Sequence, residues 1–105
     1  MDTFEAISSR RAIKKFDPSH KMTSDEVDSL MKLTILSPTS YNQQNWRFVT
    51  VTDQLIKEKI GIAARNQVQP VDGSLVILLC GNMNAWKEDP LRYWKNHPAE
   101  KQELV

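Results

Sequence analysis

The residues that could do chemistry gather first in the segment 37–46, SPTSYNQQNW, which is dense in small polar and amide side chains. Pro38 cannot continue a helix, and it favours extended geometry in the residue before it. Three amides follow at positions 42–44, and each offers hydrogen-bond donors and an acceptor. The segment could bind a planar, polar, heteroaromatic ligand, or it could be a well-made surface turn that ends in a core tryptophan, Trp46.

A second candidate is a basic cluster near the start of the chain. It contains Arg10, Arg11, Lys14 and Lys15. Arginine offers a forked pair of donors and lysine a point charge, so the cluster would attract a phosphate or another anion. A solvated basic face is the competing interpretation. A nucleic-acid contact is opposed by the short length of the cluster and by the net charge of +1.

Other catalytic arrangements find little support. His20 and His97 lack a second ligand at metal spacing, so we expect surface histidines and no metal site. Cys80 is the one cysteine and lies in an apolar run, which predicts a buried, unreactive thiol. The three glycines form no phosphate-binding pattern. Any chemistry is therefore expected to belong to a bound cofactor rather than to a side-chain nucleophile.

Three helices are expected to position these residues, over 2–9, 23–36 and 53–65. The second begins with a capping box, in which Thr23 pairs with the glutamate three residues later, and it carries an apolar stripe that should face a core. Gly61 lies inside the third helix, where glycine is unfavourable, and indicates a close contact with another element. Between the first two helices, the basic residues predict an extended or irregular connector that ends in a turn.

Two strands are expected, over 47–52 and 74–80. The second is a continuous apolar run, which is typical of a central strand buried on both faces. A polar loop is expected at 66–70. These elements predict a mixed α and β architecture in one small domain of 105 residues, with too few strands for a typical sheet of that kind.

The sequence also indicates the cellular compartment of the protein. The longest apolar run is too short to cross a bilayer, and the acidic N-terminus does not have the pattern of a signal peptide. We therefore expect a cytoplasmic protein that contacts no membrane.

Two motifs together resemble the family of FMN-dependent nitroreductases. Residues 9–16, SRRAIKKF, are similar to its motif S-R-R-S-x-R/K-x-F, and residues 37–48, SPTSYNQQNWRF, to A/S-P-S-S-x-N-x-Q-P-W-x-F. They lie at the family's relative spacing, and NQVQ at 66–69, Asp72 and an apolar strand match the next landmark. The resemblance covers residues 3–86. It implies an α+β fold with a mixed sheet flanked by helices, incomplete in this chain, in an intertwined homodimer.

The resemblance also implies a cofactor site made by three segments. In the family, the basic segment holds the phosphate tail and the electron-rich edge of the flavin ring, and the loop with proline, serine and asparagine reaches the same FMN from the other subunit. A third loop touches the ring. Cations near the pyrimidine edge would stabilise the anionic reduced flavin. The matching residues here are Arg10, Arg11, Ala12 through its backbone, Lys14, Pro38, Thr39, Ser40, Asn42, Asn66 and Gln69.

The implied activity passes a hydride from NAD(P)H, as co-substrate, through FMN to a nitroaromatic or quinone-like acceptor. No side chain is assigned a catalytic role. The implied partners are a second copy of the chain and a small-molecule electron acceptor.

The sequence also departs from the family pattern. Ala12 replaces the usual serine, and Asn45 replaces the proline before the tryptophan. Family members usually continue into a C-terminal half with further strands, a glycine-containing flavin loop and a late basic pair. We therefore interpret 1–86 as the N-terminal part of an FMN-binding domain and 87–105 as a divergent or truncated tail.

The alternative function is a truncated, non-catalytic remnant that acts as a dimerising or partner-binding module. Trp86, Tyr93 and Trp94, which lie among charged residues and prolines, would form its interaction surface or pack in the core of a swapped dimer.

Overall fold

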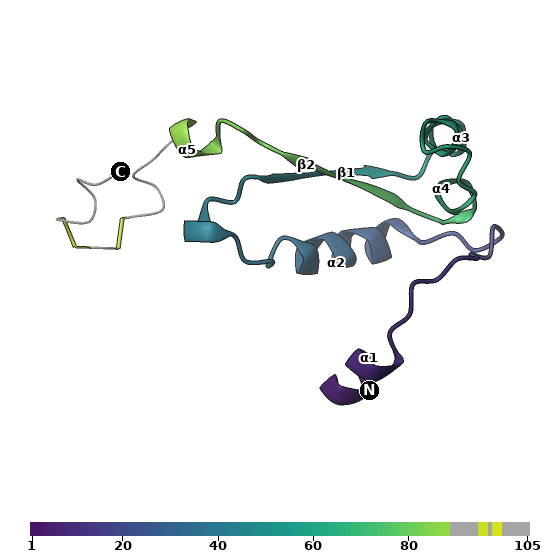
Figure 1. The fold of residues 1–105 in the computed structure, drawn as a ribbon, viewed down its shortest axis with the longest axis horizontal. Helices are drawn as coiled ribbons and strands as arrows, with labels where there is room; N and C mark the ends of the chain where they lie inside the picture. The colour runs from purple at the N-terminus through teal and green to yellow at the C-terminus, as the bar shows by residue number, and fades with distance from the viewer. Residues whose placement is uncertain (89–94, 97, 100–105) are drawn as a thin grey trace. The chain divides into compact units, whose positions relative to one another are not determined.

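The structure is a computed structural model that describes residues 1–88, 95–96 and 98–99, so the predictions for Tyr93, Trp94 and His97 lie outside the described residues. Within the described residues, two α-helices precede the first strand, two lie between the strands and one follows the second strand (Figure 1), and the fold is of the α+β class. The elements are α1 (Thr3–Ser9), α2 (Ser24–Thr34), the 3-10 turn η1 (Ser40–Asn42), β1 (Trp46–Val51), α3 (Gln54–Ala63), α4 (Gln69–Asp72), β2 (Val76–Gly81) and α5 (Ala85–Glu88).

The chain divides into two compact units, which are described separately. The first unit contains Met1–Lys21 and Thr52–Val76, and it includes α1, α3 and α4. The second contains Met22–Val51 and the chain from Ile77 onward, and it includes α2, η1, β1, nearly all of β2, and α5.

Helices α1 and α3 of the first unit each begin at an aspartate whose side chain caps them. Asp2 accepts a hydrogen bond from the backbone N–H of Glu5 at 2.8 Å, and Asp53 accepts one from Ile56 at 3.0 Å. Both caps satisfy N–H groups that have no partner inside the helix. The predicted helices at 2–9 and 53–65 are therefore confirmed, with slightly tighter bounds.

The predicted polar loop at 66–70 is wrong in its second half, because α4 begins at Gln69. Pro70 lies in the first turn of this helix. The N–H groups of the first turn have no acceptor inside the helix, so the N–H that proline lacks is not missed there. The proline therefore starts a helix here instead of preventing one.

The face of α3 that meets α4 carries Lys57 and Gly61, the buried residues of this helix. A Cβ added to Gly61 would lie 2.8 Å from Cγ2 of Val71 and 3.0 Å from the carbonyl oxygen of Gln67. The close helix contact predicted at Gly61 is thus confirmed. Leu55, an apolar residue in the first turn of this helix, is 68% exposed.

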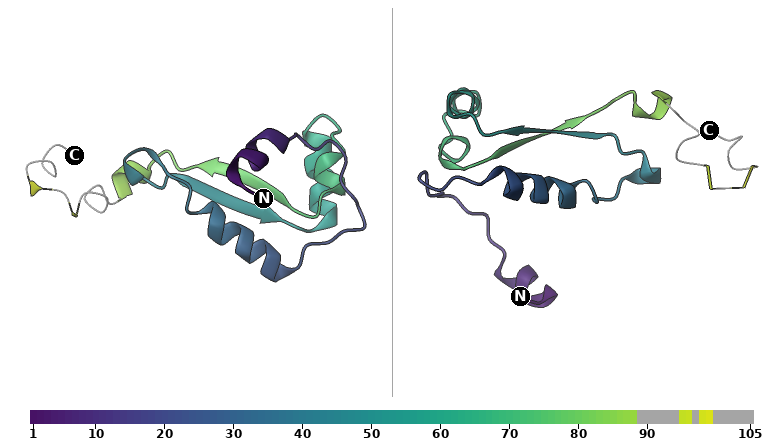
Figure 2. Two further views of the ribbon diagram at one scale, coloured as in Figure 1. Left: turned by 90° about the horizontal axis from the view of Figure 1, so that it is seen from below. Right: turned by 180° about the vertical axis from the view of Figure 1, so that it is seen from behind.

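In the second unit, β1 and β2 form a two-stranded antiparallel sheet. The N–H of Asn82 donates to the carbonyl oxygen of Asn45 at 2.6 Å, one residue beyond each strand. Helix α2 runs along one side of this strand pair (Figures 1 and 2). Its predicted capping box is confirmed, because Thr23 accepts from the N–H of Glu26 and the Glu26 carboxylate accepts from the N–H of Thr23.

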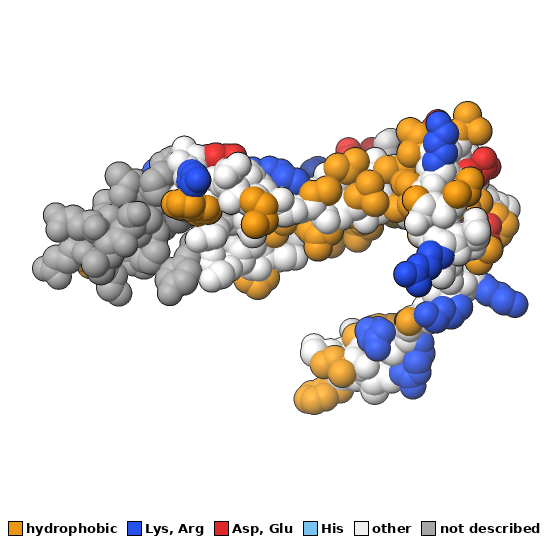
Figure 3. Space-filling model, turned by 45° about the horizontal axis from the view of Figure 1, so that its top comes forward, with side chains coloured by type: hydrophobic (Ala, Val, Ile, Leu, Met, Phe, Trp, Pro, Cys, Tyr) orange, Lys and Arg blue, Asp and Glu red, His pale blue; other side chains and the backbone are white. Residues whose placement is uncertain are grey.

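Burial was predicted less well than secondary structure. The expectation that β2 is buried on both faces is wrong for this chain, because Leu79 is 71% exposed and Cys80 is also exposed. The apolar stripe of α2 is at best half-buried, at Val27 and Met31. A strand is buried on both faces only when layers cover both, and the described residues give β2 a single partner strand. Figure 3 shows many hydrophobic side chains at the surface.

Two further expectations concern membranes and metals. No helix of the described residues combines the length and apolar content needed to cross a bilayer. Within the same residues, no three side chains of the types His, Cys, Asp and Glu gather as they would around a metal ion.

Candidate functional site

The basic segment 10–16 has no regular secondary structure, as predicted, and all of its side chains are exposed. Lys and Arg side chains gather over this N-terminal part in Figure 3. The guanidinium group of Arg11 donates to the carbonyl oxygens of Ser8 at 2.9 Å and Arg10 at 2.8 Å. The side chain of Arg11 is therefore folded back on the end of α1. Arg10, Ala12 and Lys14 are exposed to solvent.

The segment 37–46 forms a turn that is held by its own hydrogen bonds. The carbonyl oxygen of Thr39 accepts from the N–H of Asn42 at 3.0 Å, and the Thr39 hydroxyl oxygen accepts from the N–H of Gln44 at 2.9 Å. The side-chain amide of Gln44 donates to Oδ1 of Asn42 at 3.1 Å. One threonine thus organises the backbone of the turn, while Pro38 and Ser40 remain exposed on it.

Positive φ angles occur in two separate segments, the 37–46 turn and the residues just after α3. Asn42 and Gln44 have φ of 54° and 50°, and Arg65 and Asn66 have φ of 61° and 59°. Residues other than glycine rarely adopt this left-handed conformation, although asparagine does so more readily than most. Such strain persists where neighbouring contacts enforce it, and it clusters at functional sites. Two of the predicted site residues, Asn42 and Asn66, are among these four.

Asn66 and Gln69 belong to the segment that joins α3 to α4. The N–H of Gln67 donates to the carbonyl oxygen of Gly61 at 3.1 Å, which ties this segment to α3. Asn66 is exposed, whereas Gln69 is half-buried. The side-chain oxygen Oε1 of Gln69 is buried without a hydrogen-bond partner. A buried acceptor left unpaired is costly, so this atom is suited to receive a donor from a ligand.

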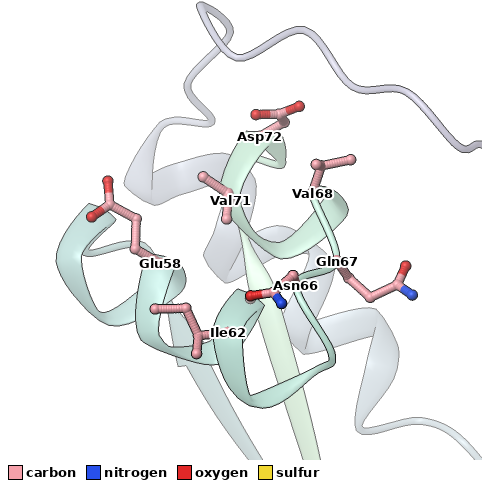
Figure 4. A pocket seen from close by; sticks show the side chains of 8 residues that line it. Glu58, Ile62, Asn66, Gln67, Val68, Val71 and Asp72 are labelled. Carbon is pink, nitrogen blue, oxygen red and sulfur yellow. The ribbon is translucent and has the colours of Figure 1, made fainter.

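A hollow of about 400 Å³ opens between α3 and the segment that leads into α4. Figure 4 shows Ile62, Asn66 and Val71 around it. Apolar side chains supply most of its surface, and two carboxylates stand among its lining residues. These residues are Glu58, Gly61, Ile62, Asn66, Gln67, Val68, Val71 and Asp72.

Sequence reasoning missed Lys57, whose side chain is completely buried between α3 and α4. Its Nζ donates to the carbonyl oxygen of Gly73 at 2.6 Å and lies 3.5 Å from that of Val71. Burial lowers the pKa of Lys57, and the positive charge of Lys21 lowers it further, whereas the carboxylate of Asp72 acts in the opposite direction. A lysine four residues before a helical glycine was the one available signal, and no general rule makes it a sign of burial.

Trp46 also has a feature that the sequence did not reveal. Its ring lies 5.4 Å from that of Phe48, centroid to centroid, and it is half-buried rather than in a core. The indole Nε1 is buried and has no hydrogen-bond partner. Next to it, Arg47 donates to the carbonyl oxygen of Gln44 at 3.0 Å and pairs with Glu88 at 3.7 Å, so the end of the turn is anchored to α5.

The predicted site residues fall into three groups. The structure brings Thr39, Ser40 and Asn42 together in one turn, next to Pro38 in sequence, within the second unit. Asn66 and Gln69 lie on the segment supported by α3, and the basic connector belongs to the same first unit. The connector carries Arg10, Arg11, Ala12 and Lys14.

Comparison with known proteins agrees with the motifs. A family model described as the nitroreductase family matches residues 7–98. Protein DrgA of Synechocystis is 46% identical over 95% of this chain and 48% of its own length. An oxygen-insensitive NAD(P)H nitroreductase of Salmonella typhimurium is 31% identical over 84% of this chain and 44% of its own. The chain therefore spans about half the length of these relatives.

Solved structures show the same fold. A nitroreductase-like protein from Streptococcus mutans superposes with a TM-score of 0.79 at 23% identity, covering 96% of this chain and 51% of its own. A candidate nitroreductase from Exiguobacterium sibiricum, solved in complex with FMN, superposes with a TM-score of 0.75 at 28% identity, covering 99% of this chain and 52% of its own. The predicted nitroreductase-like α+β fold is confirmed, and the chain belongs to the nitroreductase family.

Proposed function

We propose that this protein is an FMN-dependent oxidoreductase of the nitroreductase type, which uses NAD(P)H to reduce a nitroaromatic or quinone-like acceptor. The observation that carries the proposal is the family match over residues 7–98, which contains all three predicted cofactor-binding segments. The Salmonella relative is named as an NAD(P)H nitroreductase, and the Exiguobacterium neighbour holds FMN. Both names support the same chemistry here.

The residues present fit such a cofactor. Exposed cations at Arg10 and Lys14 would hold the phosphate. The unpaired Oε1 of Gln69 would accept a hydrogen bond from a ring N–H, and the side-chain nitrogen of Asn42 would donate one. Bound FMN would supply the two-electron chemistry between NAD(P)H and the acceptor. The task of these side chains is to bind it, orient it and stabilise negative charge on it.

A homodimer belongs to the same proposal. The exposed apolar residues of β2, such as Leu79, would then be covered by the second copy. The chain would work in the cytoplasm, where a reducing environment suits its single thiol. We also propose that residues 1–86 form the FMN-binding part of the chain and that residues 87–105 form a divergent or truncated tail.

A second candidate function is a non-catalytic module that dimerises or binds a partner. Exposed apolar side chains such as Leu79 and Trp86 would serve as the contact surface. Size-exclusion chromatography combined with an FMN titration separates the two functions, since a dimer that does not bind FMN favours the module.

The deciding experiment is a titration of the full chain with FMN, followed by flavin fluorescence and then by NAD(P)H oxidation with a nitroaromatic acceptor. Replacing Arg10 and Lys14 together by methionine should weaken FMN binding by at least about tenfold, because two charge-assisted hydrogen bonds to the phosphate are lost. Lys59→Met, which removes a charge from an exposed position on α3, should leave the affinity unchanged. A wild-type chain that shows no FMN binding would contradict the proposal.

A further inference from the structure

We propose that Lys57 is a positioning residue of the cofactor site, because it holds α4 in the place from which Gln69 meets the cofactor. This inference rests on the proposed function, and it adds a residue that the family motifs do not include. Its starting point is a lysine with no exposed surface, whose ammonium group hydrogen-bonds to the main chain just beyond α4.

The contacts of Lys57 are concentrated at the C-terminal end of α4. Nζ is 2.6 Å from the carbonyl oxygen of Gly73 and 3.5 Å from that of Val71. Carbonyl groups at the end of a helix have no partner inside it and need a donor from another element. The ammonium group therefore fixes the end of α4 to α3.

The position of Gln69 follows from the position of this end. Helix α4 has four residues, and the N–H of Gly73 donates to the carbonyl oxygen of Gln69 at 2.9 Å. One turn of helix thus separates the carbonyl held by Lys57 from the residue whose Oε1 is buried and unpaired. Moving the end of α4 would move this acceptor.

Two neighbours on α3 support the same arrangement. The side chain of Gln54 donates to the carbonyl oxygen of Val71 at 3.3 Å, which Lys57 also approaches. Gly61 lets Val71 approach so closely that a Cβ would lie 2.8 Å from Cγ2 of that valine. Lys57, Gln54 and Gly61 lie on the side of α3 that meets α4, so this side specifies both the distance and the register of α4.

Stability alone gives a weaker reason for a lysine at this position. Burying an ammonium group is costly, and an apolar side chain of similar length could fill the space without that cost. What the apolar side chain lacks is the ability to fix two specific carbonyl oxygens. A positioning role uses that ability, whereas a purely structural role does not require it.

The test titrates the full chain with FMN after Lys57→Met. We expect about tenfold weaker binding, which corresponds to the loss of one charge-assisted hydrogen bond transmitted to Gln69. Lys59→Met removes the same charge from an exposed position on the same helix and should change nothing. Gln54→Met removes a weaker, exposed hydrogen bond to Val71 and should lower the affinity by a few fold. Because Gln54 binds the same Val71 carbonyl oxygen as Lys57, the Gln54→Met variant still tests the inference if Lys57→Met does not fold.

A double-mutant cycle with Gln69→Ala distinguishes positioning from general destabilisation. If Lys57 or Gln54 acts through Gln69, its replacement should have almost no further effect on FMN affinity in the Gln69→Ala background. Additive losses, or unchanged affinity in both Lys57→Met and Gln54→Met, would overturn the inference while leaving the proposed function intact. A wild-type chain that does not bind FMN would instead overturn both.

Discussion

The side-chain amide of Gln44 donates a hydrogen bond to Oδ1 of Asn42 at 3.1 Å, and both residues have a left-handed backbone. This bond sets the orientation of the Asn42 carboxamide. Its oxygen is engaged within the turn, so its NH₂ group remains to donate to a ligand. The turn thus offers a hydrogen-bond donor in a defined direction. An asparagine without this bond could rotate its carboxamide and present either the oxygen or the nitrogen to a ligand.

Replacing Gln44 by methionine should therefore weaken FMN binding by about three- to tenfold, since the carboxamide of Asn42 would lose its fixed orientation. A titration with FMN measures the effect. Gln43→Met, at the neighbouring amide, serves as the control and should have little effect. Equal losses for the two variants would show that the turn as a whole, and not the bond between Gln44 and Asn42, determines the affinity.

Gly61→Ala should destabilise the protein, although alanine is the better helix former by about 1 kcal/mol. The new Cβ would meet Val71 and the carbonyl oxygen of Gln67, and overpacking of this kind costs about 1–3 kcal/mol. Denaturant unfolding should show a net loss of about 1 kcal/mol. Gly81→Ala is the matched control, because its Cβ meets no atom within 4 Å and should not destabilise.

Thr23→Ala should lower the free energy of unfolding by about 1 kcal/mol, since it removes the side-chain acceptor at the start of α2. The same denaturant experiment measures it. Thr23→Ser retains a hydroxyl oxygen for the N–H of Glu26 and should recover most of the loss. If the serine variant were as unstable as the alanine variant, the capping bond would not be the source of the stability.

The depressed pKa of Lys57 predicts a specific dependence of stability on pH. In the unfolded chain this lysine titrates near its ordinary value of 10.5, and in the folded chain it titrates lower because it is buried. Between the two values the unfolded state binds more protons, so the free energy of unfolding rises as the pH rises through this window. Below the folded pKa the penalty for burying the charge is complete.

The measurement compares denaturant unfolding of the wild type and Lys57→Met from neutral pH to about 10.5. Subtracting the two removes the contribution of groups that titrate alike in both proteins. The difference should shift in favour of the wild type as the pH approaches 10.5 and level off above it. A difference that stays constant with pH would show that Lys57 titrates normally in the folded chain.

Local sequence patterns predicted the starts of α1, α2 and α3 well, although the start of α4 was missed. Asp2, Thr23 and Asp53 cap α1, α2 and α3, and each does so through a backbone N–H three residues away. Interactions of such short range depend little on the remainder of the fold, so residue type and spacing suffice to predict them. The motif segments could likewise be placed on a connector and a turn.

Burial depends on contacts that the sequence pattern does not encode. Leu79 was expected inside because its strand is apolar, yet the residues that cover a sheet face come from other elements. Lys57 was overlooked for the opposite reason, because its partner Gly73 lies 16 residues later in the chain. The positive φ of Asn42 and Asn66 was also not predicted, since asparagine permits this conformation without requiring it.

The exposed position of Cys80 on β2 makes this residue a built-in chemical reporter. The sequence contains one cysteine, so alkylation adds one mass increment whose origin is unambiguous. Reaction with the thiol should be fast while the strand is bare, and it should slow when another polypeptide shields the strand. The labelling rate as a function of protein concentration therefore reports assembly without any engineered cysteine.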